Sequence, residues 1–211
     1  MADRQQTGSN RNEQYFAAQP SSSDTRRHLT VNLVGRPTTV EVSNGVFSSS
    51  RLDLGTSVLL RHTPEPPTQG NFLDLGCGWG PIALRMAFLR PQATIWAIDS
   101  NERALELTRH NAKLNAITNI EAVSADHLPD GLTFDLIWSN PPIRIGKEAL
   151  HQLLMTYLPR LTDGGAAYLV VQRNLGSDSL ITWLQAQLPQ NWTVSKYASS
   201  KGYRVIEVLH P

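Results

Sequence analysis

From residue 71 onward, short apolar runs alternate with longer stretches in which apolar residues recur every three or four positions. The short runs have the length and the β-branched and aromatic content of buried strands, and the longer stretches have the period of amphipathic helices. Such alternation is typical of a parallel sheet with helices on both faces. The pattern therefore predicts an α/β fold, with strands at 71–74, 93–98, 134–139 and 166–172 and helices at 82–90, 147–161 and, after a cap at Ser177, 178–188.

Both ends of the chain have a different pattern. Residues 29–34 and 38–42 alternate in strand fashion around a Gly-Arg-Pro turn, which predicts an amino-terminal β-hairpin, and a short helix is expected at 53–62. Residues 193–198 and 203–209 predict a second hairpin, which reverses the final strand. We divide the chain into a polar tail without fixed structure (1–14), an extension (15–62) and the main domain (63–211).

A glycine loop follows the first strand of the main domain. Asp74 ends the apolar run, Gly76, Gly78 and Gly80 follow at every second position, and Pro81 stands where a helix would begin. Such glycines let the backbone approach a ligand closely, and the amino end of a helix offers free N–H groups. The dinucleotide-binding fingerprint needs a third glycine at position 81, so the proline disfavours a pyrophosphate cradle while leaving it open.

Two further acids follow apolar runs. Asp99 ends the run 93–98, a position from which a carboxylate can accept hydrogen bonds from both hydroxyls of a ribose. Asp126 stands at the end of a third run, and a solvated turn residue is its alternative interpretation. A glycine loop alone is weak evidence for any particular ligand. A glycine loop followed by an acid at the end of the next strand, as Asp99 is here, indicates a nucleoside-containing cofactor.

The fourth feature is Asn140-Pro141-Pro142-Ile143, directly after the run 134–139. Two prolines end the strand and stiffen the backbone beyond it. Ligands bind at the carboxyl ends of the strands in an open parallel sheet, so Asn140 is a candidate active-site amide. A plain strand-ending turn is the alternative, because Asn-Pro pairs are common in turns.

Taken in this order, the glycine loop, Asp99, Asp126 and the Asn140 turn resemble the class I S-adenosylmethionine-dependent methyltransferases. More narrowly, the chain is similar to the small methyltransferase domain family, which includes ribosomal RNA small subunit methyltransferase C, over about Tyr15 to Leu209. The strings at 45–48, 53–56 and 140–147 are similar to its single-domain members. The resemblance implies a Rossmann-like, mostly parallel seven-stranded sheet with a reversed final strand. It also implies S-adenosylmethionine as cofactor, bound by Asp74, Gly76, Cys77, Gly78, Gly80, Asp99, Ser100, Asp126, His127 and Asn140.

The resemblance also implies a reaction. If the Asn140 side-chain oxygen and the Pro141 carbonyl each accept one hydrogen of an exocyclic base amine, the nitrogen lone pair can be turned toward the methyl group. Asn140 and Pro141 are thus the catalytic candidates, and Phe47, Pro142, Ile143 and Arg144 the substrate-binding ones. The family often has an aromatic residue at position 143 that stacks on the base, and isoleucine cannot stack. Phe47 is the candidate for that face, whereas Trp138 is expected to point into the core.

The composition and charge of the chain limit the kinds of binding partner that we expect. The 211 residues are 40% hydrophobic and carry a net charge of +1, so no global basic field indicates nucleic acid. An RNA substrate would need a local patch, for which the candidates are Arg144, Lys147, Arg173, Lys201 and Arg204; solvated surface charge is the alternative for each. Cys77, the only cysteine, fits a reducing cytoplasm. No signal peptide, membrane span or metal-ligand spacing is present in the sequence, and a monomer or weak dimer is expected.

Three functions remain open on the sequence. The first is methylation of an exocyclic base amine in RNA, with guanine in small-subunit (16S) ribosomal RNA as the best candidate. The second is methylation of a protein glutamine or another planar amine, because that chemistry can use the same Asn-Pro-Pro turn. The third is a non-catalytic assembly factor that binds the cofactor or only RNA.

Overall fold

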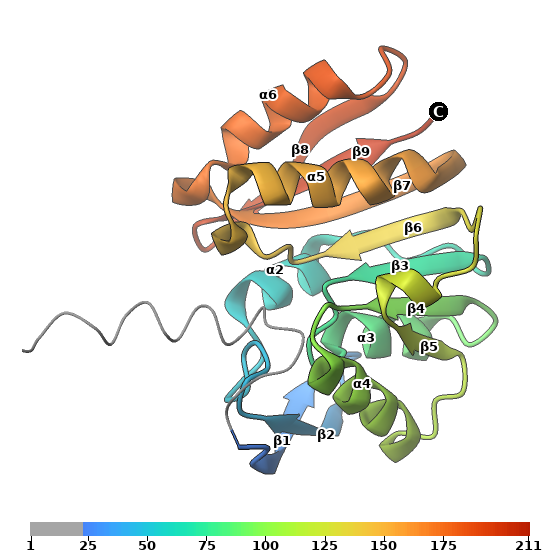
Figure 1. Ribbon diagram of the computed structural model, residues 1–211, viewed down its shortest axis with the longest axis vertical. Helices are drawn as coiled ribbons and strands as arrows, with labels where there is room; N and C mark the ends of the chain where they lie inside the picture. Colours follow the sequence, from blue (N-terminus) through green and yellow to red (C-terminus); the bar gives the residue numbers. More distant parts are fainter. Residues whose placement is uncertain (1–22) are drawn as a thin grey trace, which may run out of the picture.

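The computed structural model describes residues 23–211, so the predicted tail at 1–14 lies outside the described part. Its centre is a seven-stranded sheet of order β5-β4-β3-β6-β7-β9-β8 (Figure 1). β9 runs antiparallel to both of its neighbours, and the pairs from β5 to β7 are parallel. The predicted mostly parallel sheet with a reversed final strand is confirmed. Its strands are β3 (Asn71–Leu75), β4 (Thr94–Ile98), β5 (Ile120–Val123), β6 (Phe134–Ser139), β7 (Leu161–Gln172), β8 (Thr193–Ser200) and β9 (Tyr203–Leu209).

Helices cover both faces of the sheet, as the alternating pattern predicted. On one face α2 (Leu54–His62), α3 (Pro81–Leu89) and α4 (Glu102–Leu114) contribute to the same buried cluster as Phe72, Ile95 and Trp138. On the other face α5 (Lys147–Tyr157) and α6 (Ser177–Gln187) pack over Leu73, Ile137 and Leu169. Neighbouring residues of a strand thus enter opposite cores, because side chains alternate across a sheet. Single-turn 3₁₀ segments are η1 (Ala125–His127), η2 (Ile143–Ile145), η3 (Leu158–Arg160) and η4 (Arg173–Leu175).

The predicted amino-terminal hairpin is present as β1 (Arg26–Asn32) and β2 (Pro37–Ser43). It lies beside α4, away from β8 (Figure 1). The buried amide of Asn111 on α4 joins the two, because its oxygen accepts from Glu41 N at 2.7 Å and its nitrogen donates to Glu41 O at 2.9 Å. The boundary between extension and main domain at 62/63 stays a prediction.

Three local predictions differ from the structure. The helix expected at 147–161 ends at Tyr157, where the segment containing Pro159 tightens into η3. The strand expected at 166–172 begins earlier, at Leu161, so that β7 includes Gly164 and Gly165 next to a register irregularity against β6. Ser177 is not the cap of α6: Gly176, with a φ of 94°, occupies that position, and the Ser177 hydroxyl is buried.

Parallel pairing places the functional loops side by side. Leu75 at the end of β3 pairs with Ile98 at the end of β4 and with Ser139 at the end of β6. The loops that follow these three strands therefore leave the same edge of the sheet, where the Ser139 hydroxyl also donates to Leu75 O at 2.6 Å. None of the helices in residues 23–211 is both long and apolar enough to cross a membrane.

Candidate active site

A cleft of about 1260 Å³ opens at this edge of the sheet. Most of the site residues predicted from the sequence line it, namely Phe47, Gly76, Gly78, Asp99, Ser100, Asp126, Asn140, Pro141, Pro142, Ile143 and Arg144. Four others do not: Asp74, Cys77, Gly80 and His127 lie behind or beside the lining. The structure thus brings the predicted loops together around one space, and the roles of the individual residues remain predictions.

The glycine loop is held against β4. The backbone N–H groups of Gly76 and Cys77 both donate to Ile98 O, each at 2.9 Å. Gly78 has a φ of +57°, and a Cβ added there would meet nothing within 4 Å. Because Gly78 lines the cleft, that open space is available to a ligand that approaches the backbone closely. The loop therefore has the backbone conformation and the open space that a closely approaching ligand needs.

Asp99 joins the glycine loop to the start of α4. Its two carboxylate oxygens accept from Gly78 N and from Asn101 N, each at 2.9 Å. Burial raises the pKa of this carboxyl, and the backbone N–H donors partly oppose the shift. A third backbone N–H group, that of Ser100, also faces the carboxylate. A carboxylate has about four acceptor positions, so one remains for a further donor such as a ribose hydroxyl.

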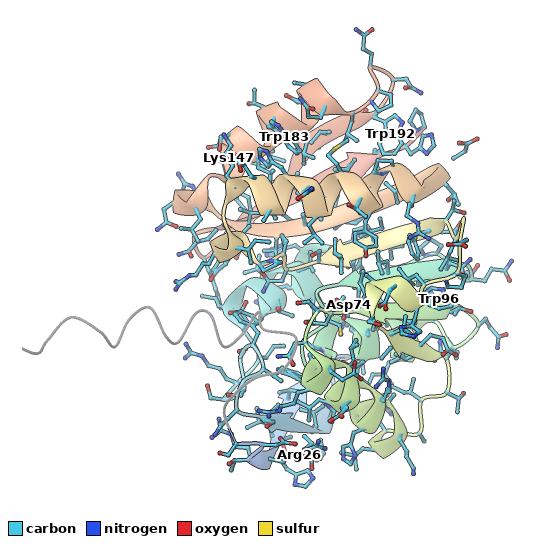
Figure 2. All side chains as sticks on the ribbon, in the orientation of Figure 1. Arg26, Asp74, Trp96, Lys147, Trp183 and Trp192 are labelled. Carbon is cyan, nitrogen blue, oxygen red and sulfur yellow. The ribbon has the colours of Figure 1, made fainter. Side chains whose placement is uncertain are left out.

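Asp74 supports the loop from inside. The side chain is fully buried, and its Oδ2 accepts from Ala83 N in the first turn of α3 at 2.9 Å. Burial, with a smaller contribution from nearby Asp99, raises the pKa of Asp74 to about 8. Figure 2 shows Asp74 in the interior of the molecule. The geometry is that of a residue that fixes the loop to α3.

Cys77 and Asp126 occupy opposite environments. Burial raises the pKa of the Cys77 thiol well above its ordinary value, which suits a packing residue rather than a nucleophile. Asp126 lies in η1, and a hydrogen bond from Ser124 holds the pKa of its carboxyl below the ordinary value. His127 beside it is exposed, with its Nδ1 2.7 Å from Ser124 Oγ.

Asn140 stands at the lip of the cleft with its amide group anchored. Its Nδ2 donates to Asp53 Oδ2 at 2.8 Å and to Thr56 Oγ1 at 3.0 Å. Next in the chain, Pro141 O accepts from Ile143 N at 2.8 Å, which uses one of the two lone pairs of that carbonyl. The turn is therefore tight and internally bonded, as the two prolines predicted.

The surroundings of Asn140 include residues that sequence reasoning missed. Asp53 and Thr56 lie in the string 53–56, for which the sequence predicted a family resemblance but no role in the site. The cleft is also lined by Tyr203 of β9 and by Gln172 of β7, which pair with each other. No local sequence pattern predicts that these two residues belong to the site. Phe47 is 47% exposed at the mouth, and its loop is held by the Trp79 indole, which donates to Ser48 O at 3.3 Å. Trp138 is buried in the core, as expected.

A sheet of this strand order, with a glycine loop after its central strand and an acid after the next, is the architecture of class I S-adenosylmethionine-dependent methyltransferases. A family model described as "Methyltransferase small domain" matches residues 37–207, and the chain belongs to that family, whose cofactor is S-adenosylmethionine.

Individual relatives are similar to the chain in sequence or in fold. The chain is 34% identical to the "Uncharacterized protein YbxB" of Bacillus subtilis, over 92% of this chain and 97% of that protein. It is 32% identical to "Ribosomal RNA large subunit methyltransferase G" of Vibrio campbellii, covering 64% of this chain and only 37% of that protein. The solved Thermus thermophilus 16S rRNA N2 methyltransferase (RsmC), in complex with AdoMet and guanosine, superposes with a TM-score of 0.75 at 23% identity, over 91% of this chain and 52% of that one.

Proposed function

We propose that this methyltransferase acts on an exocyclic amine of a base in RNA, with guanine in small-subunit ribosomal RNA as the best candidate. The observation that carries the proposal is the anchored amide of Asn140. Both of its N–H groups are engaged by Asp53 and Thr56, and among residues 23–211 nothing donates to its Oδ1. Since Asn140 lines the cleft, that oxygen is an acceptor reserved for a ligand donor.

One group of cleft residues would bind the cofactor, and another would bind the substrate amine. Gly76, Gly78, Asp99 and Asp126 line the part of the cleft that would hold S-adenosylmethionine, which supplies an electrophilic methyl carbon on a positively charged sulfur. Asn140 Oδ1 and the second lone pair of Pro141 O accept the two hydrogens of the substrate amine. The nitrogen lone pair would then point toward the methyl carbon. It would form the new N–C bond as the S–C bond breaks, with the electrons of that bond going to sulfur. The nitrogen finally releases one proton to water.

The charge around the cleft favours RNA over a protein substrate. Arg144 lines the cleft, and Lys147 begins α5 (Figure 2). Arg173 follows Gln172, and Lys201 lies two residues before Tyr203, with which Gln172 pairs. These four cations are exposed, and none forms an ion pair or side-chain hydrogen bond with another described residue. Arg204, the fifth predicted member of the patch, is instead paired with Asp178. Unneutralised cations beside an active site attract a polyanion.

The names of the relatives point in the same direction. Two of them are ribosomal RNA methyltransferases, one of the large subunit and one of 16S rRNA, so the choice of the small subunit is part of the proposal. With a ribosomal RNA substrate we also propose a cytoplasmic location for the protein. Methylation of a protein glutamine remains the second candidate, supported by the same Asn140 geometry.

Comparative mass spectrometry of ribosomal RNA tests the proposal. A strain lacking the gene should lose one methylated base, and the wild-type gene should restore it while Asn140→Ala should not. The purified Asn140→Ala protein should keep most of its affinity for S-adenosylmethionine, so that the loss is mainly in turnover. Unchanged ribosomal RNA together with protease-sensitive labelling of a lysate by methyl-tritiated cofactor would favour the protein substrate. No transfer to either would favour a binding factor.

A further inference from the structure

We infer that Asp53 and Thr56 are positioning residues for the methyl-transfer step: they hold the Asn140 amide in the orientation that turns its oxygen to the substrate amine. The inference rests on the proposed function, because it assigns the source of the orientation that the function requires. Neither residue belongs to the strand-end loops that define the fold's cofactor site; both come from the helix α2 and its cap.

The chemistry of the contacts decides which way the amide faces. The two ends of an asparagine side chain have nearly the same shape, so only hydrogen bonding distinguishes them. Asp53 Oδ2, 2.8 Å away, belongs to a carboxylate that accepts and does not donate when ionised, so Nδ2 must face it. A flipped amide would set its oxygen against that carboxylate. The Thr56 hydroxyl, at 3.0 Å, accepts the second N–H.

Asp53 is itself held in place from several sides. The same Oδ2 accepts from Thr56 N at 3.0 Å, which makes Asp53 the N-cap of α2, where the helix dipole favours a negative charge. Next to it Gly55 has no room for a side chain, since a Cβ there would lie 2.9 Å from Tyr203 Cε1 and 3.0 Å from Asp53 Oδ2. Helix α2 also packs against β7 and β9. The carboxylate is thus a fixed reference for Asn140.

Asp53 has an electrostatic effect in addition to orienting the Asn140 amide. Carboxylate, amide and substrate amine would form a chain in which each hydrogen bond polarises the next. A positive charge that develops on the amine nitrogen is then stabilised through Asn140 by the negative charge of Asp53. Asp53 does not touch the reacting atoms in this arrangement, so its effect belongs to turnover and not to cofactor affinity.

Matched substitutions separate this role from helix capping. Asp53→Ser keeps an N-cap oxygen but is too short to reach Asn140, whereas Asp53→Asn keeps an acceptor at the same place and loses only the charge. The assay uses the full-length protein, methyl-tritiated S-adenosylmethionine and total RNA from a strain lacking the gene. Exchange of the Asn140 side-chain NH₂ protons, followed by NMR, reports the hydrogen bonds independently of activity.

Asp53→Ser should lower kcat roughly 10–100-fold, the effect of losing a hydrogen bond to a charged group. Its cofactor dissociation constant and melting temperature should stay near those of wild type, and its NH₂ exchange should be faster. Asp53→Asn, which keeps the acceptor but not the charge, should recover only part of the rate. Thr56→Val should show a smaller loss that Thr56→Ser repairs, and Asp53→Ser should add nothing in an Asn140→Ala background.

The outcomes distinguish a failure of the positioning role of Asp53 from a failure of the proposed function. If Asn140→Ala abolishes transfer while Asp53→Ser changes neither kcat nor NH₂ exchange, the positioning role is overturned and the proposed function stands. If Asn140→Ala itself leaves transfer unchanged, the proposed function fails first.

Discussion

The carboxylate of Asp99 accepts a hydrogen bond from the backbone N–H of Gly78 at 2.9 Å, which ties the acid after β4 to the glycine loop after β3. The second oxygen of Asp99 accepts from Asn101 N, so both lobes of the carboxylate are oriented by backbone donors. Two elements that sequence reasoning assigned separately to the cofactor therefore form one rigid unit.

Asp99→Ala should weaken S-adenosylmethionine binding roughly 10–100-fold, because hydrogen bonds to a charged acceptor contribute about 1.5–3 kcal/mol. Isothermal titration calorimetry measures the change. Asp99→Asn, which retains an acceptor oxygen, is the control and should lose less. A dissociation constant equal to that of the wild type in the alanine variant would contradict the ribose role.

Two glycines of the loop should respond differently to alanine. At Gly80, with a φ of +88°, the new Cβ would lie 2.9 Å from Thr108 Oγ1 and 3.0 Å from its Cγ2, so Gly80→Ala should lower the melting temperature markedly. At Gly78 only the positive φ opposes alanine, at a cost of roughly 1–2 kcal/mol. Gly78→Ala should therefore remain folded and lose cofactor affinity instead. Calorimetric unfolding and titration of both variants check the contrast, and Thr108→Ala should partly rescue Gly80→Ala.

Buried Asp74 should make stability depend on pH. Its folded-state pKa of about 8 lies above the ordinary value of 3.8, so the folded protein keeps a proton that the unfolded chain releases. Stability from this group is complete below about pH 4 and is lost as the pH rises toward 8, by up to about 1.4 kcal/mol per pH unit.

Asp74→Asn should remove this component while retaining an acceptor for Ala83 N. The free energy of unfolding, measured by urea titration at pH 5.5 and 8, should fall less in the variant than in the wild type. Equal changes in the two proteins would show that Asp74 does not titrate in that range.

The four unpaired cations at the cleft should bind RNA phosphates. Replacing Arg144, Arg173 or Lys201 by glutamine should weaken RNA binding and reduce the slope of log affinity against log salt by about 0.7 per contact on single strands. Lys113→Gln is a matched control, since Lys113 is an exposed cation in the last turn of α4. Filter binding over a salt series gives the slopes, and identical slopes for rim and control variants would refute the assignment.

Phe47 should supply the aromatic face that Ile143 lacks. Stacking of a base on an aromatic side chain contributes roughly 1–3 kcal/mol, so Phe47→Ala should lower kcat/KM for RNA about 5–150-fold. Tyr197, an aromatic residue 42% exposed on β8, provides the control substitution Tyr197→Ala. Steady-state kinetics with both variants test the role, which fails if Phe47→Trp is no better than Phe47→Ala.

Most of the fold could be predicted from the sequence, because strand and helix periods, glycines and prolines act through neighbouring residues. The strand, loop and helix from 71 to 89, the acid after β4 and the Asn140 turn are of this kind. The cap of α6 was mispredicted at Ser177 because glycine in a left-handed conformation can occupy a cap position without a side-chain bond.

Tertiary structure decided what the individual polar groups face. Asp74 and Asp99 both come near the ends of neighbouring strands, yet one points into the core beneath α3 and the other toward the cleft. The orientation of the Asn140 amide depends on Asp53, 87 residues earlier in the chain. The sequence alone determined that an amide stands on a stiff turn at the edge of a parallel sheet. Which of its atoms meets the substrate is set by a carboxylate that only folding brings within hydrogen-bonding distance.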